Sequence, residues 1–296
     1  MIVVRLMGGL GNQMFQYAAG RALATRHATV LKLDLSFLER TPPGTTVRNY
    51  LLDRFPIVAE RAVPSDFPCL EDKPLSVATR AWNALLRVTG RQCGTVLLDF
   101  DHNFVDSFFS APKHSYLVGY WQSEGYFRNI RHLLLREFAT DSVLGDVNPE
   151  TVRAITTTCS VAIHVRRGDY VGTGGSASFH GICSLDYYRR AAVAMAKSIY
   201  CPNFFVFSDE PEWVRENFEL SYPYTIVDRN QDDDPVGDLG LMSLCKHHII
   251  ANSSFSWWGA WLNENPGKKI IAPSRWFAGG DHIHSEKIIP EAWIRL

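Results

Sequence analysis

Short apolar runs alternate with longer stretches of helical periodicity along most of this chain. Residues 2–6 form an apolar run interrupted only by Arg5, residues 13–27 carry apolar side chains at helical spacing, and a second apolar-rich run covers residues 29–34. This order predicts a strand, a helix and a strand, which is a β-α-β opening. A further strand is expected at residues 115–119 and a helix at residues 126–138.

The second half repeats this alternation. The expected strands are residues 160–165, 203–208, 224–227, 248–251 and 269–272, and the expected helices are residues 185–199, 212–218, 237–245 and 256–263. Strands that are separated by helices predict parallel, doubly wound sheets. We therefore expect an α/β protein of two Rossmann-like domains, each with its ligand edge at the carboxyl ends of the strands.

The predicted boundary between the two domains lies near residue 150. Residues 140–149 have the character of a linker, so residues 1–149 form the predicted first domain and residues 150–296 the second. The C-terminal segment is a candidate to pack back on the first domain. Prolines punctuate residues 40–112, where only one helix, near residues 77–88, is expected.

Composition excludes several classes of protein. Hydrophobic residues at 46% and charged residues at 21% are typical of a globular protein with a large core. A formal net charge of −1 leaves no general basic field for nucleic acid or anionic lipid, so any anion recognition must be local. Six cysteines without metal-ligand spacing predict free thiols, and the sequence shows neither a signal peptide nor a membrane-spanning stretch. A cytoplasmic protein is expected.

The most informative motif is H-V-R-R-G-D, from His164 to Asp169. Arg166 and Arg167 follow an apolar strand, and paired guanidinium groups at a strand end are suited to holding planar oxyanions such as phosphates. A structural ion-pair cluster at a domain seam is the alternative.

Two further motifs follow strands that end at the same predicted edge. Ser253 and Ser254 open a helix, so their hydroxyls and the free backbone N–H groups suit an anion, although ordinary capping beside core tryptophans would also explain them. Asp209 and Glu210 end another strand and place two carboxylates near the same ligand, or else form a solvated acidic turn.

The first half contains two candidate loops. The glycines from Gly8 to Gly11 permit close backbone approach by a ligand, with Asn12 and Gln13 as neutral hydrogen-bonding groups. A dinucleotide loop with Asp34 as the ribose ligand is the alternative, but the spacing is not G-x-G-x-x-G.

The second loop follows the expected strand at residues 115–119. Trp121 could stack on a sugar ring while Gln122 and Glu124 hydrogen-bond to it, unless these side chains only pack at the domain seam. Asp232, Asp233 and Asp234 invite comparison with the D-x-D of metal-dependent glycosyltransferases, but they lie in a polar loop that ends no strand. No metal site is expected.

Five motifs in order resemble glycosyltransferase family 11, the α-1,2-fucosyltransferases. They are G-G-L-G-N-Q-M-F-Q-Y-A at residues 8–18, G-Y-W-Q-S-E-G-Y-F at residues 119–127, H-V-R-R-G-D-Y at residues 164–170, F-S-D-E at residues 207–210 and the run at residues 241–258. The resemblance implies a GT-B fold, with the acceptor mainly on the first domain and GDP-fucose mainly on the second. It also implies metal-independent, inverting transfer from GDP-β-L-fucose to the 2-hydroxyl of a terminal galactose.

The resemblance also assigns roles to individual residues. Arg166 is expected on the donor pyrophosphate, His164 and Asp169 at flanking donor positions, and Asn12 facing the reaction centre. We therefore expect Arg166, Asn12 and Asp169 to be catalytic. The expected donor-binding residues are His164, Arg166, Arg167, Asp209, Ser253, Ser254, Phe255, Gly9 and Gly11, and the expected acceptor-binding residues are Trp121, Gln122 and Glu124.

Arg166, Ser253 and Ser254 can stabilise the charge that develops on the leaving GDP without a divalent ion. Asp169, Glu124, Asp209 and His180 are candidates for a general base by residue type, and a dedicated base is not required if the leaving group is good. We expect the two domains to close on the donor and so exclude water.

The expected partners are GDP-fucose and a galactose-terminated oligosaccharide or lipid-linked glycan. Peripheral contact with the inner membrane face is left open, and no nucleic acid is expected. A fucosyltransferase of other linkage and a noncatalytic nucleotide-sugar or glycan-binding protein are the alternatives.

Overall fold

The computed structural model describes residues 1–40, 46–63, 66, 95–99, 104, 106–140, 149–168, 181–228, 235–277 and 287–296. The predicted helix near residues 77–88 and most of the predicted linker at residues 140–149 lie outside these ranges. The chain divides into two compact units, the first comprising Met1–Asp53 and Ile57–Leu134 and the second Arg54–Pro56 and Leu135–Leu296. This division falls at Leu134, earlier in the chain than the predicted boundary.

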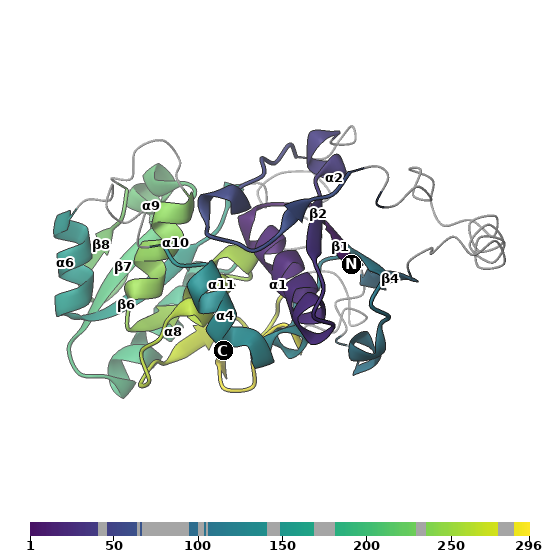
Figure 1. The fold of residues 1–296 in the computed structure, drawn as a ribbon. Coiled ribbons are helices and arrows are strands. Elements are labelled where there is room, and N and C mark those ends of the chain that lie inside the picture. Colours follow the sequence, from purple (N-terminus) through teal and green to yellow (C-terminus); the bar gives the residue numbers. More distant parts are fainter. Residues whose placement is uncertain are drawn as a thin grey trace, which may run out of the picture. The chain divides into compact units, whose positions relative to one another are not determined.

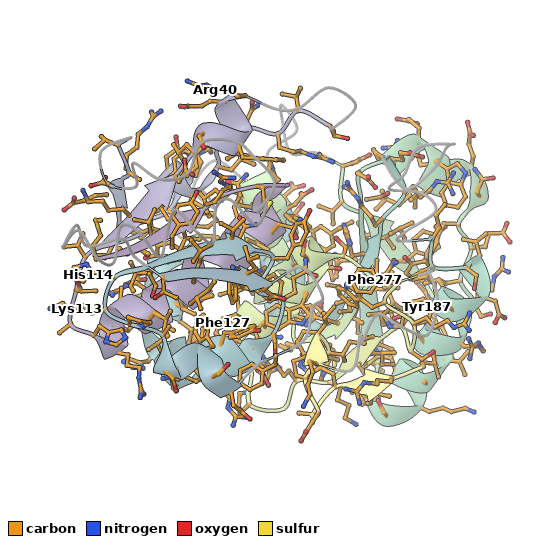
Figure 2. All side chains as sticks on the ribbon, turned by 90° about the vertical axis from the view of Figure 1, so that its right-hand side faces the viewer. Arg40, Lys113, His114, Phe127, Tyr187 and Phe277 are labelled. Atoms are coloured by element: carbon orange, nitrogen blue, oxygen red, sulfur yellow. The ribbon has the colours of Figure 1, made fainter. Side chains whose placement is uncertain are left out.

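The first unit contains a five-stranded sheet in the order β3-β2-β1-β5-β4, and all its strand pairs are parallel (Figure 1). Its elements are β1 (Ile2–Arg5), α1 (Leu10–Arg26), β2 (Leu31–Asp34), α2 (Ser36–Glu39), η1 (Leu52–Arg54), β3 (Glu60–Arg61), β4 (Thr95–Asp99), η3 (Asp106–Ser110), β5 (Ser115–Gly119), η4 (Glu124–Tyr126), η5 (Arg128–Ile130) and the start of α4 (Arg131–Glu137). Helix α1 packs on β1, β2 and β5. Figure 2 shows the exposed Lys113 and His114 at the rim of this unit.

The second unit contains a six-stranded parallel sheet in the order β11-β10-β9-β6-β7-β8. Its elements are α6 (Pro149–Thr157), β6 (Cys159–Val165), α8 (Leu185–Ser198), β7 (Pro202–Ser208), α9 (Pro211–Asn217), β8 (Tyr224–Ile226), α10 (Pro235–Leu244), β9 (His247–Ile249), α11 (Ser254–Leu262), β10 (Ile270–Ala272) and β11 (Ile294–Arg295). The predicted class, α/β with two Rossmann-like parallel-sheet domains, is confirmed.

Helices cover both faces of the second sheet because successive side chains of β6 point to opposite faces. Val161, Ile163 and Val165 pack with side chains of α8 and α9 on one face. Ala162 packs with side chains of α6 and α10 on the other. Two buried faces require the near-continuous apolar runs from which these strands were predicted.

The differences from the predicted elements are local. Helix α1 begins at Leu10 and so includes residues 10–12, where a turn was expected before a helix that starts at Gln13. The expected helix at residues 126–138 is divided into η4, η5 and α4, and β3, β4, α6 and β11 were not predicted. The last of these, β11, pairs with β10, so this part of the C-terminal segment belongs to the second sheet.

No helix within the described ranges is long and apolar enough to cross a lipid bilayer.

Candidate functional site

Three motifs of the second unit meet at one edge of its sheet. Strands β9, β6 and β7 are parallel neighbours in that order, and Val165 of β6 pairs in register with Ser208 of β7. The residues that follow these strands therefore emerge side by side at the carboxyl edge. The predicted convergence of the arginine, acidic and serine motifs on this edge is confirmed.

Arg166 faces Asp209 across this edge. Its Nη1 lies 3.0 Å from Oδ2 of Asp209, and both side chains are about one-fifth exposed. The other carboxylate oxygen, Oδ1, accepts a hydrogen bond of 3.0 Å from the backbone N–H of Arg167. Asp209 therefore holds the guanidinium of Arg166 and the start of the following loop together, which orients Arg166 before any ligand binds.

Arg167 is held by different partners. Its Nε donates to Oε2 of Glu210 at 3.1 Å, and its guanidinium carbon stands 3.6 Å from the centre of the Trp213 ring. A guanidinium that is stacked and paired in this way is fixed by the fold. Gly168 lies so close to Asp209 that a Cβ at this position would stand 2.3 Å from Oδ2 of Asp209. Arg166 and Arg167 are thus distinct in their surroundings although they are adjacent in sequence.

His164 is a buried, neutral side chain at the same edge. It is 3% exposed, its ring centre lies 5.5 Å from that of Phe255, and its Nδ1 has no hydrogen-bond partner in the part of the chain that the structure describes. Burial, and then the charge of Arg166, lower the pKa of His164 to about 3. At neutral pH His164 therefore adds no charge to the edge.

This burial predicts a pH dependence of stability. Burial also lowers the pKa of His248 to about 3, and its Nε2 donates to the Met242 carbonyl at 2.8 Å. The pKa of a histidine in the unfolded chain is about 6.5. Below that pH the histidines of the unfolded chain are protonated, whereas the same histidines in the folded chain stay neutral. The free energy of unfolding should therefore fall as the pH falls from about 6.5 towards 3, by about 1.4 kcal/mol per pH unit for each histidine.

Denaturant titrations between pH 7 and pH 5, where carboxylates hardly titrate, would measure this slope. The His248→Gln variant should show a smaller slope than the wild type, whatever its absolute stability. A stability that is constant from pH 7 to pH 5 would contradict the prediction.

Helix α11 begins directly after β9 at this edge. Ser253 is buried at the N-cap position, yet within the described residues its side chain makes no capping hydrogen bond. Ser254 and Phe255 are half-buried in the first turn. The capping explanation therefore does not account for Ser253. Asn252 fastens the preceding turn, because its Nδ2 donates to the carbonyls of Gly181 and Trp276.

The tryptophans of this motif belong to the core. Trp257 and Trp258 are fully buried, and Nε1 of Trp257 donates to the carbonyl of Ile288 at 2.8 Å. Their rings form an aromatic cluster with Trp261 and Phe138. The core interpretation holds for the tryptophans.

The glycine loop of the first unit connects β1 to α1. Gly8 has a φ of +78°, which favours glycine, and a Cβ there would stand 2.5 Å from Nδ2 of Asn12. Gly9 is the N-cap of α1, and a Cβ there would meet no atom within 4 Å. Gly11 is buried in the first turn of the helix. The loop thus leaves open space at Gly9 and holds Asn12 half-buried above Gly8.

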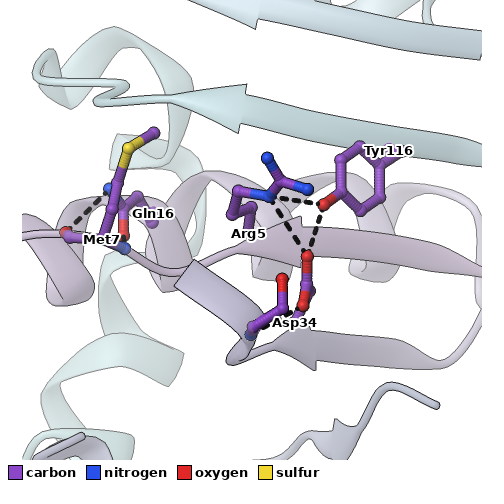
Figure 3. Close-up of polar contacts among 6 residues, drawn as sticks. Arg5, Met7, Gln16, Asp34 and Tyr116 are labelled. Carbon is purple, nitrogen blue, oxygen red and sulfur yellow. Dashed lines mark hydrogen bonds and ion pairs between the residues drawn. The ribbon is translucent and has the colours of Figure 1, made fainter. Parts of the chain in front are cut away.

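Two fully buried glutamines of α1 hold this loop. Gln13 accepts from the N–H of Leu51 and donates to the carbonyls of Gly8 and Asn49. Gln16 accepts from the N–H of Met7 and donates to the Met7 carbonyl (Figure 3). Its Nε2 also donates at 3.1 Å to the carbonyl of Gly119, at the end of β5.

The loop after β5 carries the predicted acceptor residues. Trp121 is 3% exposed and packs against Phe108 and Tyr126, which favours the packing alternative for this ring. Gln122 is also buried, and its Nε2 donates to Oδ1 of Asn12 at 2.8 Å. Glu124 is half-buried at the start of η4. The structure thus brings Gln122 and Asn12 together.

Asp34, the residue that a dinucleotide site would use, is engaged within the protein. It accepts from Arg5 Nε at 3.2 Å and from the Tyr116 hydroxyl at 2.5 Å (Figure 3). It also accepts from the N–H of Ser36 at 2.9 Å. Burial alone would raise the pKa of Asp34, but the bonds from Tyr116 and Ser36 and the charge of Arg5 bring it below its ordinary value. These contacts count against the dinucleotide alternative.

Comparison with known proteins decides the family. The model of glycosyl transferase family 11 matches residues 100–296. An α-1,2-colitosyltransferase of Escherichia coli is 33% identical over 302 aligned residues, which cover 100% of this chain and 98% of the relative. The chain belongs to glycosyltransferase family 11.

Two more relatives extend this result. The O-antigen biosynthesis glycosyltransferase WbnK of Escherichia coli is 31% identical, and the alignment covers 98% of this chain and 99% of WbnK. The galactoside alpha-(1,2)-fucosyltransferase 2 of Oryctolagus cuniculus is 28% identical over 49% of this chain and 43% of its own length. The family 11 resemblance seen in the motifs is therefore confirmed.

Two candidate site residues of this family 11 glycosyltransferase, Asp169 and His180, lie outside the described residues. So do Asp232, Asp233 and Asp234, at which no metal site was expected. Within the described ranges, no three histidine, cysteine, aspartate or glutamate side chains are grouped so that they could hold a metal ion.

The sequence analysis assigned no role to three residues whose contacts hold the candidate sites of this family 11 chain in place. They are Gln16, Asn252 and Trp213, which act through contacts with segments distant in sequence. A signal for one of them, Gln16, was present, because Gln13 and Gln16 are three residues apart and share one face of a helix whose other buried residues are apolar. Two glutamines on a buried face need several partners each.

Proposed function

We propose that this family 11 glycosyltransferase transfers L-fucose, with inversion, from GDP-β-L-fucose to the 2-hydroxyl of a terminal galactose in a glycan. The observation that carries the proposal is the carboxyl edge of the second sheet, which we call the donor edge. It contains Arg166, Asp209 and the buried Ser253, which stands at the N-cap of α11 without a capping hydrogen bond among the described residues. A fixed guanidinium beside a helix N-terminus provides the donors that a nucleotide pyrophosphate requires.

The proposed reaction is a single displacement at the anomeric carbon. The acceptor oxygen forms its bond to C1 of fucose while the bond from C1 to the β-phosphate oxygen breaks, and GDP leaves with the electron pair. The hydroxyl proton passes to a base or to solvent, and we assign no general base. Arg166 and the hydroxyls of Ser253 and Ser254 stabilise the charge that develops on the phosphate, as preorganised donors do at oxyanion sites.

Asn12 is assigned to the acceptor side. It is half-buried in the first turn of α1, where its amide lies against Gly8. A neutral amide at this position can hydrogen-bond to the attacking hydroxyl and orient it, which contributes through positioning and not through proton transfer.

Colitosyl transfer is the second candidate function. The full-length relative with 33% identity is named an alpha-1,2-colitosyltransferase, and colitose lacks the 3-hydroxyl of fucose. A site that hydrogen-bonds to this hydroxyl discriminates strongly against the sugar that lacks it, whereas a site that makes no such bond accepts both.

Product analysis tests both candidates. The purified protein is incubated with GDP-fucose or GDP-colitose and a panel of galactosides, and the linkage of each product is determined by NMR. We expect a sugar α-linked to the 2-position of galactose from GDP-fucose. Transfer from GDP-colitose alone would replace the proposal by the second candidate, and another linkage, or binding without transfer, would refute both.

Transfer is expected to persist in EDTA. Arg166 already supplies the positive charge beside the leaving group that a divalent ion supplies in other glycosyltransferases. Initial rates measured with and without excess EDTA should agree within about twofold on this view. Complete loss of activity that only manganese or magnesium restores would contradict it and make Asp232 and Asp234 the first residues to test.

A further inference from the structure

The amide of Asn12 has one direct side-chain partner in the first unit, Gln122, among the contacts seen in the described ranges. Nε2 of Gln122 lies 2.8 Å from Oδ1 of Asn12, and on its other side Nδ2 of Asn12 lies over the backbone of Gly8. The two residues are separated by 110 positions in the sequence. The orientation of the Asn12 amide therefore depends on the loop after β5, the strand that pairs with β1.

Gln122 is poorly placed to bind an acceptor directly. The residue is 6% exposed, its side-chain nitrogen donates to Asn12, and its buried Oε1 has no hydrogen-bond partner among the described residues. A buried oxygen atom that accepts no hydrogen bond lowers the stability of the fold by about 1–3 kcal/mol, and an apolar side chain of the same size would avoid this loss. A purely structural role does not explain why a glutamine stands here.

The backbone around Gln122 is built to hold it. Trp121 has a φ of +55°, a conformation that is rare for a bulky residue, and the N–H of Ser123 donates to the Trp121 carbonyl at 2.8 Å. This tight turn is centred on Gln122. Gln16 then ties the end of β5 to the loop after β1 through its bonds to Gly119 and Met7. The spacing between Gln122 and Asn12 is thus set by buried contacts.

We propose that Gln122 is a positioning residue, which fixes the amide of Asn12 for the reaction and does not itself contact the acceptor. The proposal rests on the proposed function, because it takes Asn12 to orient the attacking hydroxyl. An amide held in one orientation presents a fixed donor or acceptor to the hydroxyl, whereas a free amide loses part of its contribution to turnover. Gln122 should then affect turnover only when Asn12 is present.

A double-mutant cycle tests this dependence. We expect Gln122→Met, which keeps the length of the side chain, to lower kcat on the order of 10-fold while the KM for the donor changes by less than about twofold. In the Asn12→Ala background the same change should have no further effect on kcat. The thermal midpoint of each variant is measured alongside, so that a loss of folded protein is not counted as a loss of turnover.

Two outcomes of the cycle would overturn the proposal. An increase in acceptor KM that is equal in both backgrounds would show that Gln122 contacts the acceptor directly. A lower thermal midpoint with an unchanged kcat would show that Gln122 only stabilises the fold.

A second measurement does not depend on turnover. The side-chain amide resonance of Asn12, identified by its loss in Asn12→Ala, should shift in Gln122→Met, and an unchanged resonance would also overturn the proposal. A wild-type enzyme that transfers neither sugar from its GDP donor would refute the proposed function, while the resonance would still report on Gln122.

Discussion

Arg166→Ala is expected to lower turnover on the order of 100-fold or more while the protein stays folded, because it removes a fixed cationic donor from the leaving pyrophosphate. The stability cost should be small, since the ion pair with Asp209 is partly exposed and Asp209 keeps its bond from the backbone of Arg167. Steady-state kinetics with GDP-fucose, together with circular dichroism of the variant, would separate the two effects.

Arg166→Lys should recover little of the lost turnover, since an ammonium group cannot reproduce the planar fork of a guanidinium. Arg190→Ala is a suitable control, because Arg190 is also paired with an aspartate, Asp186, but lies on the exposed surface of α8. Near wild-type turnover of the Arg166→Ala enzyme would remove Arg166 from the proposed donor site.

Gln16→Leu is expected to reduce the free energy of unfolding by about 3 kcal/mol or more. The leucine would remove three buried hydrogen bonds at once, two to Met7 and one to Gly119, and each group left without a partner costs about 1–3 kcal/mol. The loops after β1 and β5 would also lose their connection, so turnover should fall in the protein that stays folded. Denaturant unfolding followed by tryptophan fluorescence measures the first effect.

Thr25→Ala, on the exposed surface of the same helix, is the matched control, and its effect should stay within about 0.5 kcal/mol. If Gln16→Leu were as stable as this control, the buried hydrogen bonds of Gln16 would not contribute to the fold as described.

The regular parts of the fold could be predicted because their periodicity is strong. Strand β5 was predicted with the bounds that it has, and β6 and β7 begin one residue earlier than predicted. Strand β4 was missed: it lies at the edge of its sheet, and Leu98 is about half exposed. Strand β11 has only two residues, which is too short for any periodicity.

The candidate site could be predicted only in part. Parallel strands bring their carboxyl ends to one edge, so the meeting of Arg166 with Asp209 followed from the order of the elements. The burial of Trp121 and the bond between Gln122 and Asn12 depend on a left-handed backbone at residue 121 and on packing across the unit. Neither has a signature in local sequence.

The pairing of charges at the donor edge also affects the rate at which a nucleotide associates with the enzyme. Within the described residues, Arg166 stands beside Asp209 and Arg167 beside Glu210, so each guanidinium is balanced by a carboxylate before anything binds. Such an edge exerts little attraction beyond its immediate surroundings, and diffusional encounter with an anion is not steered over long distances. Capture then depends on short-range fit, and ionic strength acts only weakly on the rate of association.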